Sequence, residues 1–367
     1  MDTNFRYTFP AIRGVQANRE YFVSMCPLHL IPKIFIWDEE VLPPELRAQR
    51  ILNKARVPEM ARYLTDGPDK YVFSAITASI DAEVTFESFG DNNTPSNINQ
   101  IGALHVPMSA RFVINDGQHR RAAIEAALHQ KPELGDETIA VVFFIDQGLE
   151  RCQQMFADLN RYAVRPSRSL GLLYDHRDEM ASISRLVALK STAFKDMVEM
   201  EKSTLSARSR KLFTLSAIHT ATSVLLNNIE TELDDDRSSL AIEFWDEVST
   251  HIPEWQLVKD RKISAGEVRQ DFIHSHGVAL HALAKIGNEL LRQQPKQWKK
   301  IISKISTIDW SRTNAELWEG RALIIGRVSK ANQSVTLTTN ILKQHLGLKL
   351  KPEEAEIEES FLRGENV

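Results

Sequence analysis

The alternation of apolar and polar positions divides the chain into two parts that meet near residue 168. In the first part, apolar residues alternate with polar ones or form short runs, as they do in β-strands. Segments with this pattern are 19–25, 33–36, 71–80, 82–89, 104–108, 111–114 and 138–145, and helical patterns cover 45–65 and 149–159. We expect 104–108 and 111–114 to pair with each other, and residues 1–168 to form a mixed α/β core.

After residue 168 the strand patterns almost disappear. Apolar residues there recur at the spacing of amphipathic helices. The segments with this spacing are 176–200, 207–229, 238–250, 269–293, 295–304 and 331–346. The pattern therefore predicts a helical domain over residues 169–367.

The strand pattern at 111–114 runs directly into a polar turn and a helix, and residues 116–121 read Asp-Gly-Gln-His-Arg-Arg. Asp116 is a candidate N-cap, and Gly117 lets a ligand approach the backbone closely. The first backbone N–H groups of a helix and its positive dipole end favour an anion, and Arg120 and Arg121 add positive charge. The segment predicts a phosphate-binding corner. The alternative is a capped helix whose arginines form surface ion pairs.

Composition narrows the class of protein. The 367 residues carry a formal net charge of −4, so DNA binding would need a local basic face. Cys26 and Cys152 are too few for a disulfide framework, and reduced thiols are expected. His274, His276 and His281 lack the carboxylate or cysteine that would complete a metal set, so no metal site is predicted. With no signal-peptide layout and no long apolar run, we expect a cytoplasmic protein away from the membrane.

A basic segment lies at residues 202–211, with four basic residues, several hydroxyls and no acidic residue. Such a segment suits contact with the phosphodiester backbone of DNA. The alternative is a solvated loop before a helix that starts at 207. A second basic segment, 292–304, equally fits the ordinary solvent face of a helix. The candidate DNA contacts are Arg161, Arg165, Arg168, Lys202, Arg208, Arg210 and Lys211.

Two further polar groups have weaker interpretations. Asp158 and Asn160 end a predicted helix, where they would orient an arginine or contact a phosphate, or only cap the helix end. A basic cluster that includes Arg50 and Arg56 would add phosphate contacts, although an ordinary surface helix is slightly favoured.

Residues 116–123 carry the signature of the DGQHR-domain proteins, which the chain resembles. Segments 9–14, 47–64 and 156–160 also fit. That group is similar to the ParB and sulfiredoxin fold, in which an arginine-bearing strand–turn–helix corner holds nucleotide phosphates. Within it the chain most resembles the DndB family of DNA phosphorothioation (sulfur modification) proteins. The resemblance implies an α/β (α+β), ParB/sulfiredoxin-like mixed-sheet core with a large α-helical C-terminal part. Gln118 and His119 stand where sulfiredoxin chemistry needs a cysteine, so sulfinic-acid reduction is not expected.

Two functions follow from these observations. The first, implied by the resemblance, is a DNA-binding accessory protein that binds promoter double-stranded DNA and represses its own modification operon. The alternative is an NTPase that binds and hydrolyses ATP, or another nucleoside triphosphate, with Mg²⁺. Other phosphorothioation proteins and further copies of the chain are the expected protein partners. Catalysis would fall to Asp116, His119 and Arg120, and phosphate or nucleotide binding to Gly117, Gln118, His119, Arg120, Arg121 and Asn160.

Overall fold

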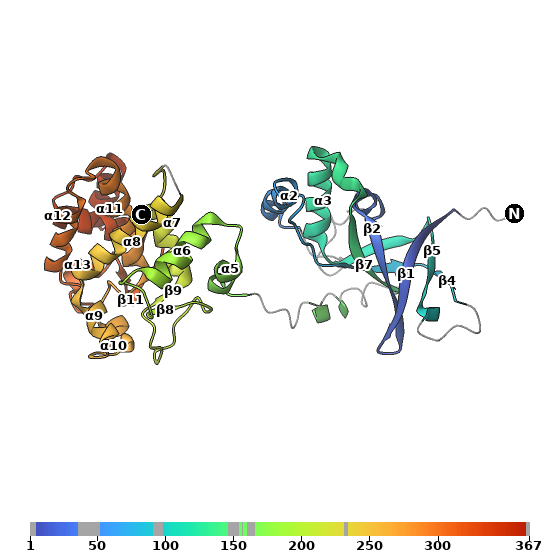
Figure 1. Cartoon of the computed structure of the whole chain (residues 1–367), viewed down its shortest axis with the longest axis horizontal. Coiled ribbons are helices and arrows are strands. Elements are labelled where there is room, and N and C mark those ends of the chain that lie inside the picture. The colour runs from blue at the N-terminus through green and yellow to red at the C-terminus, as the bar shows by residue number, and fades with distance from the viewer. Residues whose placement is uncertain are drawn as a thin grey trace. The chain divides into compact units, whose positions relative to one another are not determined.

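The computed structural model describes residues 5–35, 52–90, 98–145, 154–155, 157–159, 166–230 and 234–364. The chain folds into two compact units, Met1–Val164 and Arg165–Val367, which we call the sheet unit and the helical unit. Figure 1 shows the strands of the first in blue to green and the helices of the second in green to red. Each unit has its own hydrophobic core.

The sheet unit is built on seven described strands in the order β4-β5-β1-β2-β7-β3-β6. Neighbouring strands are antiparallel except β3 and β7, which are parallel. The strands are β1 (Arg6–Gln16), β2 (Arg19–Pro27), β3 (Ile76–Asp81), β4 (Thr85–Ser88), β5 (Ile101–Pro107), β6 (Arg111–Asp116) and β7 (Thr138–Ile145). The mixed α/β fold class expected from the sequence is confirmed.

The sheet corrects one expected pairing and adds one strand. β5 and β6 follow each other in the chain, yet β5 pairs with β1 and β4 whereas β6 pairs with β3, so the expected pair does not form. β1, which the pattern did not predict, forms a hairpin with β2. Ala17 and Asn18 both have positive φ (50° and 60°), as the two-residue turn of such a hairpin requires.

The helices of the sheet unit whose bounds lie within the described residues are α1 (Ile31–Ile34), α2 (Val57–Thr65) and α3 (Gln118–Gln130). α3 buries Ala123 and Ile124 in the same core as the strand residue Ile76. The expected strand at 33–36 is wrong over its described residues, because the short helix α1 begins at Ile31, with Pro32 in its first turn, and ends at Ile34. Short 3₁₀ turns cover Leu28–Leu30, Lys54–Arg56, Ile98–Gln100 and Pro132–Asp136.

In the helical unit, other helices pack around α11, which is buried on most of its surface. In the core of this unit the ring of Phe194 contacts the rings of Phe213, Trp245 and Trp255, and Phe213 also contacts Trp255. The described helices are α5 (Arg168–Tyr174), α6 (Glu179–Lys190), α7 (Leu215–Leu225), α8 (Asp234–Thr250), α9 (Pro253–Lys259), α10 (Ala265–Asp271), α11 (Gly277–Gln293), α12 (Trp298–Ile302), α13 (Ala315–Trp318), α14 (Asn332–Leu346) and α15 (Pro352–Leu362).

Several helix boundaries differ from those expected. The segment 207–229 becomes helical only at α7, where the Thr214 side chain accepts a hydrogen bond from the Ala217 N–H and caps the helix. The segment 269–293 is divided into α10 and α11, and the segment 295–304 gives α12 and a 3₁₀ turn at Ser303–Thr307. Two short strand pairs complete the unit: β8 (Val198–Glu199) with β9 (Phe213–Thr214), and β10 (Leu323–Ile324) with β11 (Arg327–Val328). Among the described helices, none has the length and apolar character needed to cross a bilayer.

Candidate functional site

The corner predicted at residues 116–121 lies at the end of β6, an edge strand of the sheet. Asp116 is the last residue of β6 and pairs with Thr77 of β3. Gly117 has a φ of 110° and is the N-cap of α3, with no side-chain capping bond. The expectation that Asp116 caps the helix is therefore wrong. Glycine is required at this turn because L-residues rarely adopt such a φ, and a Cβ would lie 3.0 Å from Ile76 Cγ1.

Arg120 is a mostly buried residue whose hydrogen bonds hold the corner together. Its Nη2 donates to the Asp116 carboxylate (2.6 Å to Oδ2) and to the main-chain carbonyl of Ala75 (3.0 Å). The Arg120 side chain is only 18 % exposed, whereas the Asp116 side chain is 48 % exposed. Arg120 Nε is buried without a hydrogen-bond partner among the described residues. The arginine thus ties the start of α3 to the residue before β3, and the carboxylate faces the surface.

Arg121 is buried and bonds to a different set of acceptors from those of Arg120. Its Nε donates to the carbonyl of Phe35 (2.9 Å), its Nη2 to the carbonyl of Pro32 (3.3 Å), and its Nη1 to Glu125 (2.5 Å). Three acceptors of the protein therefore occupy this guanidinium. Its contacts anchor the end of α1, which is the role of a structural arginine.

The remaining corner side chains also bond within the sheet unit. Gln118 is buried and its Nε2 donates to the carbonyl of Ile114 (3.4 Å), and His119 Nε2 accepts the Asn53 N–H (3.2 Å). The start of α3 remains the feature that favours an anion, through its dipole and its first N–H groups. Asn160 lies outside the described residues.

In the helical unit, residues 202–211 form an irregular loop between β8 and β9, which we call the basic loop. The expected helix from 207 does not form. One side of the loop is fixed to the start of α5: Ser167 Oγ donates to the Glu201 carbonyl, and the Ser169 N–H donates to Ser203 Oγ (3.0 Å). The Ser169 hydroxyl in turn accepts the N–H of Ser216 (3.2 Å).

The other side of the basic loop is held by Arg269 of α10. Its guanidinium donates to four main-chain carbonyls of the loop, those of Ser206 (2.8 Å), Ala207 (3.2 Å), Ser209 (3.3 Å) and Lys211. Burial lowers the pKa of Arg269 from its usual range. This role leaves no local signal in the sequence, because the contact joins positions about sixty residues apart. The basic loop is therefore a fixed irregular segment.

With its backbone held, the basic loop leaves most of its cations outside. Lys202, Arg208 and Arg210 are exposed, as is Arg168 at the start of α5, and no acidic side chain of the described residues forms an ion pair with any of the four. Lys211 differs, since its Nζ donates to the carbonyl of Asp196 (2.9 Å). Of the expected DNA contacts, Arg161 and Arg165 lie outside the described ranges.

Other residues singled out in the sequence have structural contacts. Lys299 pairs with Glu243 (2.6 Å), and Lys304 donates to the carbonyl of Leu346 (3.1 Å), so part of the second basic segment joins helices together. His274 is fully buried, accepts the Trp255 Nε1–H (3.1 Å) and lies 3.3 Å from Glu254. Asp158 accepts from Gln154 (2.8 Å), whereas Arg50 and Cys152 fall in stretches that the structure leaves undescribed.

These features define a two-unit protein with a glycine-containing strand–turn–helix corner in a mixed sheet and an exposed cationic loop in a helical unit. A family model described as DndB, DNA-sulfur modification-associated, matches residues 9–349, nearly the whole chain. The chain therefore belongs to the DndB family and has a role in DNA sulfur modification. No curated protein and no solved structure matches it.

Proposed function

We propose that this protein is a DNA-binding accessory and regulatory component of the sulfur modification system, which binds promoter double-stranded DNA and represses its own modification operon. The observation that carries the proposal is the basic loop, whose backbone is held by Arg269 while Lys202, Arg208 and Arg210 stay exposed. The family membership supplies the context, since the modification system acts on DNA.

An ordered backbone in the basic loop lowers the entropic cost of binding DNA. Fixing long cationic side chains on DNA costs conformational entropy, and a loop that also had to order its backbone would add about 1–2 kcal/mol per residue. Here the hydrogen bonds from Arg269 of α10 already order the backbone, and the Ser169 N–H of α5 holds the Ser203 side chain. Arg168, placed beside the loop by the bonds of Ser167 and Ser169, would add a fourth phosphate contact. Contacts of this kind give salt-dependent affinity without reading the base sequence.

The nucleotide alternative gains less support from the corner. The Asp116 carboxylate is engaged by Arg120, and the three bonded nitrogens of Arg121 all face protein acceptors. With these bonds in place, Asp116 and Arg121 do not fit a role on the phosphates of an Mg²⁺–nucleoside triphosphate. An anion at the start of α3, held by backbone N–H groups, is the part of that hypothesis that the geometry favours.

The test is binding of a fluorescent promoter duplex over a salt series. We expect the triple variant Lys202→Gln, Arg208→Gln, Arg210→Gln to flatten the slope of log K against log salt by about 3, since each lost phosphate contact removes about 0.9. The matched control removes three charges from another surface of the helical unit: Lys296→Gln, Lys299→Gln, Lys300→Gln. A reporter driven by the operon promoter should be derepressed by the first triple variant only.

Two results would contradict the proposal. One is wild-type protein that shows no salt-dependent shift of the duplex. The other is an equal loss of affinity in both triple variants, which would assign binding to the overall charge instead of the basic loop.

A further inference from the structure

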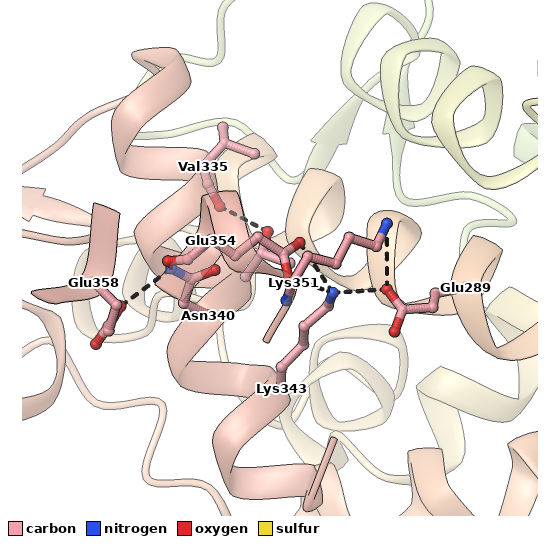
Figure 2. A network of polar contacts seen from close by, with 8 residues as sticks. Glu289, Val335, Asn340, Lys343, Lys351, Glu354 and Glu358 are labelled. Atoms are coloured by element: carbon pink, nitrogen blue, oxygen red, sulfur yellow. Dashed lines mark hydrogen bonds and ion pairs between the residues drawn. The ribbon is translucent and has the colours of Figure 1, made fainter. Parts of the chain in front are cut away.

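A pocket of about 410 Å³ opens in the helical unit beside the polar network drawn in Figure 2. The end of α7, one face of α11, the helix α14 and the start of α15 line it. From α11 the lining includes Lys285, Glu289 and Arg292, which lie on one face because their spacings of four and three residues match the helical repeat. The volume is in the range of small-molecule sites, about 300–1,000 Å³.

One part of the pocket wall is electrically balanced. Lys343 is 1 % exposed, and its Nζ donates to Glu289 (2.6 Å) and to both oxygens of Glu354 (2.9 and 2.8 Å). Lys351 Nζ lies 3.8 Å from the same Glu289 carboxylate. Figure 2 shows the two ammonium groups converging on these carboxylates. Burial alone would raise the pKa of Glu354. The hydrogen bonds from Lys343 and Lys351 outweigh burial, so the pKa of this carboxyl is lowered. Two cations therefore neutralise two anions.

The other part of the wall has an excess of positive charge. Lys285 and Arg292 line the pocket, and neither forms an ion pair with any acidic residue that the structure describes. Lys285 is half-buried. Burial lowers the pKa of its ammonium, Lys343 and Lys351 act in the same direction, and Glu354 opposes them. A half-buried ammonium that forms no ion pair with a described acidic residue favours the binding of an anion beside it.

We propose that this pocket binds a small phosphate-bearing molecule, with Lys285 and Arg292 on the phosphate oxygens. A phosphate monoester carries about −1.5 to −2 charges near neutral pH. This charge matches Lys285 and Arg292, the two cations that the carboxylates do not neutralise. Arginine offers two parallel donors to a phosphate and lysine a point charge, so the pair can bind different oxygens of one group. The site is independent of the basic loop and of the corner, and it does not rest on the proposed DNA binding.

Calorimetric titration of the full chain with inorganic phosphate and with pyrophosphate, against chloride at matched ionic strength, tests the inference. We expect a saturable site whose binding depends on Lys285 and Arg292. Lys285→Met keeps most of the side-chain volume. Arg292 is exposed, so Arg292→Gln should leave folding intact. Each should weaken binding by about tenfold or more, as the loss of a charged hydrogen bond does. Lys299→Gln, a charge change elsewhere in the unit, should leave binding unchanged.

The possible outcomes distinguish a phosphate site in this pocket from one in the corner and from DNA binding. No saturable heat with either anion, or binding that survives both variants, would overturn it. Loss of binding in Arg120→Gln, with Lys285→Met unaffected, would move the phosphate to the corner. Reduced DNA affinity in Lys285→Met would make the pocket part of the DNA surface and also refute the small-molecule site. The triple basic-loop variant should still bind pyrophosphate, so failure of the DNA proposal leaves this result readable.

Discussion

The corner and the basic loop are both rich in cations, and the protein uses them in opposite ways. In the corner, the cations are the anchors: Arg120 and Arg121 donate to main-chain carbonyls and to carboxylates of the same unit. In the basic loop, the anchor comes from elsewhere, because Arg269 binds the loop's carbonyls. The cations of the loop itself are then left to the solvent, apart from Lys211.

This difference shows how little residue type alone says about function. A guanidinium that becomes buried must satisfy its donors within the protein, because unpaired buried donors cost free energy. Arg121 is such a buried guanidinium, and its donors bond to Phe35, Pro32 and Glu125. An exposed cation on a fixed backbone keeps its donors for a partner. Variants of the two regions should therefore differ, with stability affected in the corner and DNA affinity in the basic loop.

The largest expected effect of this contrast is on Arg121. Arg121→Met should destabilise the sheet unit by about 4 kcal/mol, since two main-chain carbonyls each lose a donor at about 1–3 kcal/mol, and the ion pair with the half-exposed Glu125 adds little. Urea unfolding measures it. Glu125→Gln, which keeps an acceptor at a more exposed position, should cost much less. A loss below that of Glu125→Gln would mean that Arg121 is not the anchor of this region.

The next effect concerns acid and the support behind the basic loop. Burial lowers the pKa of His276 to about 4 from 6.5; Arg312 and Lys330 act in the same direction, and the hydrogen bond to the Arg269 carbonyl (2.8 Å) opposes them. Between those values the unfolded chain binds a proton that the folded chain does not. Stability is therefore complete above pH 6.5 and falls by about 3 kcal/mol as the pH falls to 4.

The measurement is the free energy of unfolding of the helical unit as a function of pH. His276→Gln keeps a donor for the Arg269 carbonyl and removes the titration, so its stability should change less over the same pH range. Because His274 and Glu254 also have lowered pKa values, some acid sensitivity should remain in the variant. Identical pH profiles for the two proteins would show that His276 is not responsible.

The third prediction separates the anchor of the basic loop from its cations. Arg269→Met removes a half-buried charge whose donors bond to the loop and leaves the exposed cations Lys202, Arg208 and Arg210 in place. It frees four loop carbonyls and should cost about 2 kcal/mol, because those carbonyls can in part form hydrogen bonds with water instead. DNA affinity should fall with a nearly unchanged salt slope, since the phosphate contacts keep their number. Proteolysis within residues 202–211 should become faster. A flattened slope in this variant would instead make Arg269 a phosphate contact itself.

These contacts also mark what the sequence could and could not predict. Period and length were enough for β7 and for the change from strands to helices, because local patterns determine both. The pattern also led to the segment 116–121, since a glycine between a strand and a helix is a local signal. It could not show which way Arg120 and Arg121 point, because their acceptors at Ala75 and Phe35 lie about forty-five and about eighty-six residues earlier. The partners of β6 and of the basic loop are equally non-local.

The smallest effect tests whether the corner acts through its backbone. Gly117→Ala places a side chain at φ 110° and a Cβ 3.0 Å from Ile76 Cγ1, which should cost about 1–2 kcal/mol. If the start of α3 is an anion site, the same substitution should weaken phosphate binding there more than Asp116→Asn does, because the carboxylate is a neighbour and not a ligand. Equal stability of Gly117→Ala and wild type would mean that the turn relaxes freely. The corner would then lack the rigid backbone that anion binding at a helix start requires.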